Sequence, residues 1–498
     1  LNDLQSMSKI PLLVAANCDS GGNGACSEGT YIASGAQAEA AGDLQVSYHA
    51  GLVSAREEKA LGVNVNFDPC VDILYNWRNT IVNTRAYGTD AETVIKYTNA
   101  YLDGLTAENG ENMEDGVIQC IKHFPGDGTE ERDQHLVLGV NELSPEEWRA
   151  SFGKVYQNHI DRGVEMIMAG HIAVPALQKE LNPALEDKDI MPATLAEELI
   201  QDELKTELGF NGLVITDATH MLGMTSAMRR EDYVPKSIAA GCDMFLFFNN
   251  IAEDFGFMLK GYQNGVITEE RLTDALRRIL GLKAKLHLPE KQANGTLLRT
   301  REDLNVIGCE EHLQWRAEAA DKGISLIKDT QNNLPINPVD HKRIRLYMLE
   351  GEKGGITDNG SKAQQLFVDE LTKRGYEVTV NERGSRVKGA TLKYRDEVDF
   401  ALEVADIAGY GAQNNYRIQW STAMANEVPW FVWEVPHAFV SLNFTTHLHD
   451  ATMVKTFVNA YHNNEETIKQ VIDKLEGKSE FKGGHNDLVW TDKWQAKL

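Results

Sequence analysis

The 498-residue sequence lacks an excess of basic residues and lacks any long uninterrupted hydrophobic run. Its formal net charge of −25 at pH 7 argues against nucleic acids and anionic membranes as partners, because both would repel the chain. Apolar runs such as 239–248 and 429–435 are much shorter than the roughly 18 residues of a membrane span. We therefore expect no nucleic-acid partner and no membrane span.

Cysteine is also sparse, with six residues that form no Cys-X-X-Cys pair. A chain of this length has no need of a disulfide framework, so we expect none. The first residues show no basic segment followed by an apolar one, which favours a cytoplasmic location. The chain opens at Leu1 rather than Met, however, so secretion after removal of a leader stays open.

Short apolar runs alternate with longer helical patterns over residues 1–290. Helical patterns occupy segments such as 195–208 and 269–286. Repeated βα units predict a parallel sheet, and we expect an α/β fold of the (β/α)8 TIM-barrel type with two strands unplaced. An open doubly wound sheet is the alternative. The runs suited to buried parallel strands are 11–17, 63–67, 117–121, 165–170, 212–216 and 242–247.

Residues 291–315 are polar and rich in turn formers, and we interpret them as a linker to a second domain. The pattern over 316–498 predicts a smaller α/β sandwich domain, with a loop at 350–362. Its expected helices are 313–322, 362–375, 453–461 and 465–476, and its expected strands are 323–329, 343–349, 377–380 and 430–435.

Polar side chains with chemical potential follow the apolar run at 117–121. Lys122 and His123 come directly after it, and the Pro-Gly-rich loop that follows carries Asp133 and His135. In a barrel the active site forms at the carboxyl ends of the strands. An aspartate two residues from a histidine can accept the Nδ1 proton and raise the imidazole pKa, which suits general acid/base catalysis. The alternative is a solvated loop with incidental charges.

Asp217 follows the apolar run at 212–216 and is expected just past the end of a strand. A carboxylate there can be a nucleophile, a base or a metal ligand, or simply the N-cap of the next helix. His220 lies three residues on, but no third ligand has suitable spacing, so we expect no metal.

Two further residues, Arg85 and His171, join the candidate site residues. Arg85 offers a planar fork that suits vicinal hydroxyls or a carboxylate, although a surface ion pair is equally consistent with its position. His171 follows the run at 165–170 and either meets the substrate or is a hydrogen-bonded histidine in the wall.

Four segments follow one another along the first part of the chain: KHFPGDG with DQH, MAGHIAVPAL, LGFNGLVITDATHM and AAGCDMFL. Together they resemble glycoside hydrolase family 3, and more narrowly its β-N-acetylglucosaminidase branch. The resemblance spans roughly residues 10–290, and the segment 319–336 resembles the start of the second α/β domain of many members.

The resemblance implies a role for each matching residue. Asp217 would be the nucleophile, and His135 the general acid/base with Asp133 as its partner. The hydroxyls of the sugar in the −1 subsite would be held by Lys122, His123 and Arg85. A histidine acid/base is peculiar to the N-acetylglucosaminidase branch, which points to a carbohydrate substrate containing N-acetylglucosamine, with no cofactor.

The chain departs from the family pattern near the first strand. Asn17 and Asp19 stand where members commonly carry the two acidic residues of a D-Q-E-G-G motif, and Asp127 replaces the histidine of G-H-G. We expect Asn17 and Asp19 at the substrate, with altered contacts to the sugar O4 and O6.

The sequence therefore predicts a retaining exo-β-N-acetylglucosaminidase that works through a covalent glycosyl-aspartate. Three alternatives stay open: a phosphorylase that uses phosphate as acceptor, a β-glucosidase, and a carbohydrate-binding protein without catalysis. The sequence leaves the oligomeric state open.

Overall fold

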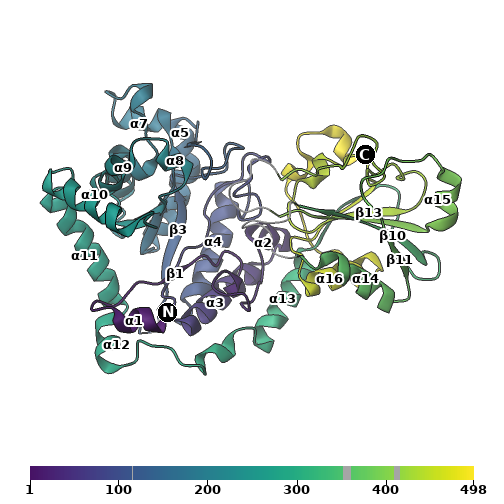
Figure 1. The fold of residues 1–498 in the computed structure, drawn as a ribbon, viewed down its shortest axis with the longest axis horizontal. Coiled ribbons are helices and arrows are strands. Elements are labelled where there is room, and N and C mark those ends of the chain that lie inside the picture. The colour runs from purple at the N-terminus through teal and green to yellow at the C-terminus, as the bar shows by residue number, and fades with distance from the viewer. Residues whose placement is uncertain (115, 352–360, 409–415) are drawn as a thin grey trace. The chain divides into compact units, whose positions relative to one another are not determined.

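The computed structural model describes residues 1–114, 116–351, 361–408 and 416–498. The chain divides into two compact units, of which the first contains residues 1–35 and 44–313 and the second 36–43 and 314–498. Each unit holds one six-stranded sheet (Figure 1). The predicted α/β class is thus confirmed. Most of the loop expected at 350–362 lies outside the described residues.

The sheet of the first unit consists of six parallel strands that are hydrogen-bonded in their order along the chain. A doubly wound sheet reverses its order at a switch point, and this order does not reverse. Each strand coincides with a run predicted from the sequence. The closed eight-stranded barrel stays a prediction. The strands are β1 (Ala15–Ala16), β2 (Val65–Asn66), β3 (Ile118–Phe124), β5 (Met166–Ala169), β7 (Leu213–Ala218) and β8 (Met244–Leu246).

A short parallel pair, β4 (Gly139–Val140) and β6 (Ile172–Ala173), stands apart from this sheet. The helix expected at 195–208 forms over Glu198–Glu207 with π geometry. The helices of the first unit are α1 (Asn2–Met7), α3 (Leu44–Leu61), α4 (Ala91–Thr106), α5 (Pro145–Trp148), α6 (Lys154–Asp161), α7 (Pro175–Leu181), α8 (Leu222–Thr225), α9 (Arg230–Ala239), α10 (Ile251–Gln263), α11 (Glu269–Lys285) and α12 (Leu288–Asn294).

Helices α3 and α4 pack closely against each other (Figure 1). Their approach depends on two glycines, because a Cβ on Gly51 would lie 1.9 Å from the carbonyl oxygen of Tyr101, and one on Gly104 equally close to that of Tyr48. Only a residue without a side chain permits this backbone contact. The pair therefore forms a rigid support beside the sheet.

The middle strands carry the core of the first unit. Ile118, Met166 and Leu213 are 1% exposed or less, and Leu282 of α11 and Leu286, which caps that helix, pack into the same cluster. Strands buried in this way are stiff, since a close-packed interior resists displacement. They hold the polar residues at their carboxyl ends in fixed positions.

The sheet of the second unit has the order β11-β10-β12-β13-β14-β9, with only β9 antiparallel to its neighbour. Helices α14 and α16 pack beside each other against it (Figure 1). The strands are β9 (Ser325–Asp329), β10 (Arg343–Glu350), β11 (Glu377–Val380), β12 (Phe400–Asp406), β13 (His437–Ser441) and β14 (Thr456–Asn459). The helices are α2 (Gly35–Ala41), α13 (Glu310–Gly323), α14 (Ala363–Lys373), α15 (Thr391–Glu397) and α16 (Glu465–Leu475).

Two predictions for the second unit are wrong. Residues 430–435 form turns instead of a strand, because the backbone N–H of Val435 donates to the carbonyl of Phe431. Phe431 and Val435 pack into one core cluster and Val432 into another. The helix expected at 453–461 is instead strand β14, where Phe457 stacks on Phe439 of β13. Pairing with a neighbouring strand overrides the local pattern there.

In the part of the chain that the structure describes, every helix is too short or too polar to cross a lipid bilayer.

Candidate active site

Lys122 is the centre of a buried polar network at the end of β3. Its side chain is 1% exposed, and Nζ lies 2.8 Å from Oδ1 of Asp68 and 3.5 Å from Oδ1 of Asp19. Nζ also donates to Oδ1 of Asn17 at 3.0 Å. The backbone is held as well, because the N–H of Val71 donates to the Lys122 carbonyl at 2.7 Å. A buried ammonium group requires such partners, since they replace its lost hydration.

Arg85 contacts the same network through Asp19, with 3.2 Å between Nε and Oδ2. Burial raises the pKa of Asp19, but the charges of Arg85 and Lys122 outweigh this effect and lower the pKa overall. Asp68 shifts the other way, because burial and the nearby Asp19 raise its pKa well above the usual value. One ionised carboxylate, Asp19, thus lies between two cations.

His123, the next residue of β3, is bonded to a buried aspartate. Its Nδ1 lies 2.7 Å from Oδ2 of Asp72, whose Oδ1 accepts a hydrogen bond from the backbone of Asp127. Burial raises the pKa of Asp72, but His123 and these hydrogen bonds lower it overall. An ionised Asp72 holds the proton of the ring on Nδ1 and leaves Nε2 to face a ligand.

The same place has the composition of a metal site. Cys70, Asp72 and His123 bring their ligand atoms within 4.8 Å of one another. Asp72 is already hydrogen-bonded to both of the other residues: its Oδ2 lies 3.0 Å from Sγ of Cys70 and 2.7 Å from Nδ1 of His123. Burial also raises the pKa of the Cys70 thiol well above its ordinary value, so the thiolate that a metal prefers is disfavoured. The arrangement is a hydrogen-bonded support for His123.

Asp133 and His135 form a hydrogen-bonded pair. Nδ1 of His135 lies 2.6 Å from Oδ1 of Asp133, which is fully buried, whereas the histidine side chain is 30% exposed. The loop is anchored to the segment after β7, because Leu222 and Gly223 donate backbone hydrogen bonds to the carbonyls of His135 and Gln134. Asp133 therefore orients the partly buried imidazole, and the segment after β7 fixes the backbone that carries it.

The electrostatic surroundings favour the charged form of this imidazole. Burial lowers the pKa of His135, but the hydrogen bond and charge of Asp133 outweigh it and raise the pKa overall. The negative charge of Asp217 acts in the same direction. The side chains of His135 and Asp217 are thus close enough to interact.

Asp217 lies within β7, one position before its end, rather than past the strand. Its Oδ1 accepts a hydrogen bond of 2.7 Å from the backbone of Ala218. Helix α8 has Met221 as its N-cap, so the N-cap alternative for Asp217 is wrong. Burial raises the pKa of Asp217, but the nearby His123 and His171 outweigh it and lower the pKa overall. This carboxylate is ionised over a wide pH range.

His171 is fully buried, and both of its ring nitrogens have partners. Nδ1 lies 3.0 Å from Oγ1 of Thr194, and Nε2 lies 2.9 Å from the carbonyl oxygen of Ala218. Burial lowers the pKa of His171. Contact with a substrate would require one of these hydrogen bonds to break.

The structure brings all the candidates of the sequence together at the carboxyl ends of neighbouring strands, by direct contact or by electrostatic interaction. They are Asn17, Asp19, Arg85, Lys122, His123, Asp133, His135, His171 and Asp217. Sequence reasoning missed Asp68 and Asp72, which hold Lys122 and His123. The available signal was the position of Asp68 directly after the run at 63–67, the criterion that also selected Lys122 and Asp217; Asp72 lies four residues further on.

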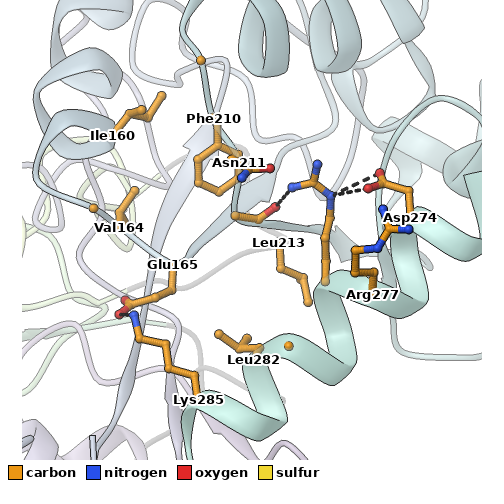
Figure 2. Close-up of a pocket in the computed structure, with 15 residues that line it drawn as sticks. Ile160, Val164, Glu165, Phe210, Asn211, Leu213, Asp274, Arg277, Leu282 and Lys285 are labelled. Carbon is orange, nitrogen blue, oxygen red and sulfur yellow. Dashed lines mark hydrogen bonds and ion pairs between the residues drawn. The ribbon is translucent and has the colours of Figure 1, made fainter. Parts of the chain in front are cut away.

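A cavity of about 670 Å³ lies elsewhere, at the amino ends of β5 and β7 (Figure 2). Figure 2 shows the ion pair between Glu165 and Lys285 at its rim. Asp274 pairs with Arg278 rather than with the labelled Arg277. The residues that line it include Phe210 and Leu282 but none of the candidates. The cavity is therefore separate from the site described above.

Comparison with protein families gives one match that covers most of the first unit. The model described as "Glycosyl hydrolase family 3 N terminal domain" matches residues 2–282. A "Beta-N-acetylglucosaminidase/beta-glucosidase" from Cellulomonas fimi is 39% identical over 500 residues, which cover 99% of this chain and 86% of that protein. A "Beta-hexosaminidase A" from Pseudoalteromonas piscicida is 27% identical over 343 residues, covering 65% of this chain and 55% of that protein.

Solved structures give the same picture. A beta-glucoside phosphorylase superposes with a TM-score of 0.92 at 38% identity, covering 99% of this chain and 87% of that one. A family 3 beta-N-acetylglucosaminidase from a Paenibacillus strain superposes with a TM-score of 0.78 at 22% identity, covering 95% and 86%. The second likeness concerns the fold alone.

Proposed function

The chain belongs to glycosyl hydrolase family 3 and is a glycoside hydrolase that acts on O-glycosyl bonds, and from this premise we propose that it removes terminal β-linked N-acetylglucosamine with retention of configuration. The carboxylate of Asp217 attacks the anomeric carbon while the imidazolium of His135 protonates the leaving oxygen. The glycosidic bond breaks and a glycosyl-aspartate forms. Neutral His135 then takes a proton from water, which displaces the aspartate and releases the sugar.

One arrangement carries this proposal: the loop of His135 is hydrogen-bonded to the segment after β7, the strand that contains Asp217, and the pKa values of the two groups shift in opposite directions. The pKa of the carboxyl is lowered, with burial opposed by His123 and His171. The pKa of the imidazole is raised, with burial opposed by Asp133. A nucleophile must be ionised and an acid must be protonated at the same pH, and these opposite shifts widen the range in which both hold.

The surrounding network supplies the groups that a sugar needs. Lys122, His123 and Arg85 are donors for ring hydroxyls, and Asp19 is an ionised acceptor between two of them. Their place at the carboxyl ends of successive parallel strands supports the further proposal that the first unit is an eight-stranded TIM-type barrel. We also propose an α/β sandwich for the second unit, and the packing of α14 and α16 against its sheet supports this.

The choice of N-acetylglucosamine is supported by the histidine in the acid/base position. The relative from Cellulomonas fimi, which is 39% identical, is named for both N-acetylglucosamine and glucose, and this supports a substrate of that kind. Exo action at the chain end is part of this proposal.

Phosphorolysis is a second candidate function. After it donates its proton, an imidazole is neutral, whereas a carboxylate acid/base would repel an incoming phosphate. The 38% identity to a solved beta-glucoside phosphorylase favours this candidate too. In this variant of the reaction, phosphate takes the place of water in the second step and the product is a sugar 1-phosphate.

The test compares p-nitrophenyl β-N-acetylglucosaminide with the β-glucoside, each with and without inorganic phosphate, and follows the product by NMR. We expect β-configured N-acetylglucosamine as the first product, at least tenfold faster than glucose. A tenfold preference for the glucoside would overturn the sugar assignment. Accumulation of a sugar 1-phosphate at the expense of free sugar would establish phosphorolysis instead.

The nucleophile is tested by trapping with a 2-deoxy-2-fluoro glycoside and peptide mass spectrometry. Asp217→Asn should lose more than about a thousandfold in kcat and take up no label. Asp161→Asn, an exposed change at the end of α6, is the matched control and should behave as wild type. Label on any other residue would refute the assignment.

A further inference from the structure

Phe247, the first residue after β8, has an unusual conformation and an exposed ring. Its φ is 60°, in the left-handed region that bulky side chains rarely adopt. Its side chain is large and apolar, yet the residue is 56% exposed. Phe247 thus combines a solvent-exposed aromatic ring with an unfavourable backbone conformation, and its ring lies outside the buried core.

The segment after Asp217 holds Phe247 in this conformation. The hydroxyl of Thr219 donates to the carbonyl of Phe247 at 2.6 Å, and the Thr219 backbone N–H donates to Leu246 at 3.1 Å. Thr219 is fully buried and lies two residues after Asp217. The two strand ends are thus joined, and the position of Phe247 depends on the same backbone that positions Asp217.

A second exposed ring lies beside Phe247. The ring centroid of His220 is 5.9 Å away, and the two planes are inclined by 34°. His220 is exposed and follows β7 in the chain, so the two rings come from adjacent strands. Both lie beyond the carboxyl ends of these strands, at the end of the sheet that carries Asp217.

We propose that Phe247 and His220 form a stacking surface for the leaving group, meaning the sugar or aryl ring on the far side of the bond that breaks. Rings of this kind present flat apolar faces that pack well on exposed aromatic side chains. Strained residues persist where function selects them, which accounts for the backbone of Phe247. This inference rests on the proposed glycosyl transfer and adds the part of the site that selects the aglycone.

Phe248 provides a matched control. It is the next residue, has the same side chain and is 58% exposed, but its ring has no aromatic partner among the described residues. If exposure of a phenylalanine near β8 affected activity in a general way, Phe248→Ala and Phe247→Ala would have the same effect.

The experiment compares two donors that differ only in the leaving group, a β-linked disaccharide and the corresponding β-glycosyl fluoride. Fluoride is a single atom and cannot use a stacking surface. Phe247→Ala should lower kcat/KM for the disaccharide about five- to tenfold, with the fluoride changed less than twofold. Phe248→Ala should change neither donor, and Phe247→Gly, which suits the left-handed backbone, should match Phe247→Ala in kinetics without lowering Tm.

Equal losses on both donors, or equal effects of Phe247→Ala and Phe248→Ala, would overturn the stacking surface. Wild-type protein that cleaves neither donor would refute the proposed function itself, together with this inference. If wild-type protein cleaves both donors and Phe247→Ala changes kcat/KM for neither, the proposed function stands and only the stacking surface is refuted.

Discussion

At the scale of single residues, the chemistry depends on how Asp133 controls His135. A free imidazole has a pKa near 6.5 and is mostly neutral at pH 7.5. Burial would lower that pKa further, and the charge and hydrogen bond of Asp133 reverse the direction. The buried aspartate also fixes the ring, since Nδ1 is its partner. Nε2 is left as the atom that transfers the proton.

Asp133→Asn should move the alkaline limb of the pH profile to lower pH. The substitution removes the main interaction that raises the pKa of His135, so the effect of burial is no longer opposed by it. The protonated form needed for the first step is then lost at lower pH. A kcat/KM profile measured between pH 4 and 9 checks this, with Asp161→Asn as control. An unchanged alkaline limb would contradict the role of Asp133.

The residues of the candidate site differ in how readily the sequence reveals them. Lys122, His123 and Asp217 could be predicted because each comes at the end of an apolar run, and strand ends in a parallel sheet meet at one edge. Asp68 and Asp72 follow β2, a strand of only two residues, and their partners lie some 50 positions away. Their pairing depends on β2 lying next to β3, which local patterns do not specify.

At the scale of elements, the strands of the first unit were predictable because their runs are short, apolar and bounded by turns. The second unit was harder. Strand β12 (Phe400–Asp406) is fully buried but contains Glu403 and Asp406, and these charges hide its apolar character in the sequence. A strand buried on both faces gains its stability from its neighbours, so its own sequence is a poor guide.

Helix α3 carries a buried acid that makes stability depend on pH. Glu58 is fully buried, and both of its oxygens accept hydrogen bonds from Nδ2 of Asn66. Burial raises the pKa of Glu58 to about 8. The unfolded chain releases this proton near pH 4.3, so the folded state binds one more proton between that pH and 8. Stability therefore falls as pH rises through this window, by roughly 1.4 kcal/mol per unit.

Glu58→Gln should remove this dependence. We expect the variant to equal wild type near pH 4 and to exceed it by roughly 3–5 kcal/mol at pH 8.5, because a neutral amide has no proton to lose. Among the described residues, the Oδ1 of Asn66 has no hydrogen-bond partner, so it can accept from the new amide. Thermal unfolding at pH 5 and 8.5 measures the difference. Glu92→Gln on the exposed face of α4 is the control. If the stability gained by Glu58→Gln does not increase with pH, the role of Glu58 is refuted.

At the scale of the whole molecule, charge is the dominant feature. The chain has 74 acidic against 49 basic residues, and its formal net charge is −25 at pH 7. Many ion pairs lie at the surface, and each contributes at most about 1 kcal/mol because water screens it. The excess of like charges, by contrast, is summed over the molecule and opposes the compact state. These two effects of charge respond to salt in opposite directions.

Salt should stabilise this protein at neutral pH and not at its isoelectric point. Raising sodium chloride from 10 to 300 mM shortens the screening length from about 30 Å to below 10 Å, which removes most repulsion between distant charges and leaves close pairs less affected. We expect Tm to rise by about 2–5 °C at pH 7.5. At pH 5.0 the net charge is near zero, so added salt has little repulsion to screen. It still weakens the surface ion pairs, and Tm should therefore stay unchanged or fall slightly. Potassium chloride should have the same effect as sodium chloride, because screening depends on ionic strength. An equal rise of Tm at both pH values would mean that net charge does not limit stability.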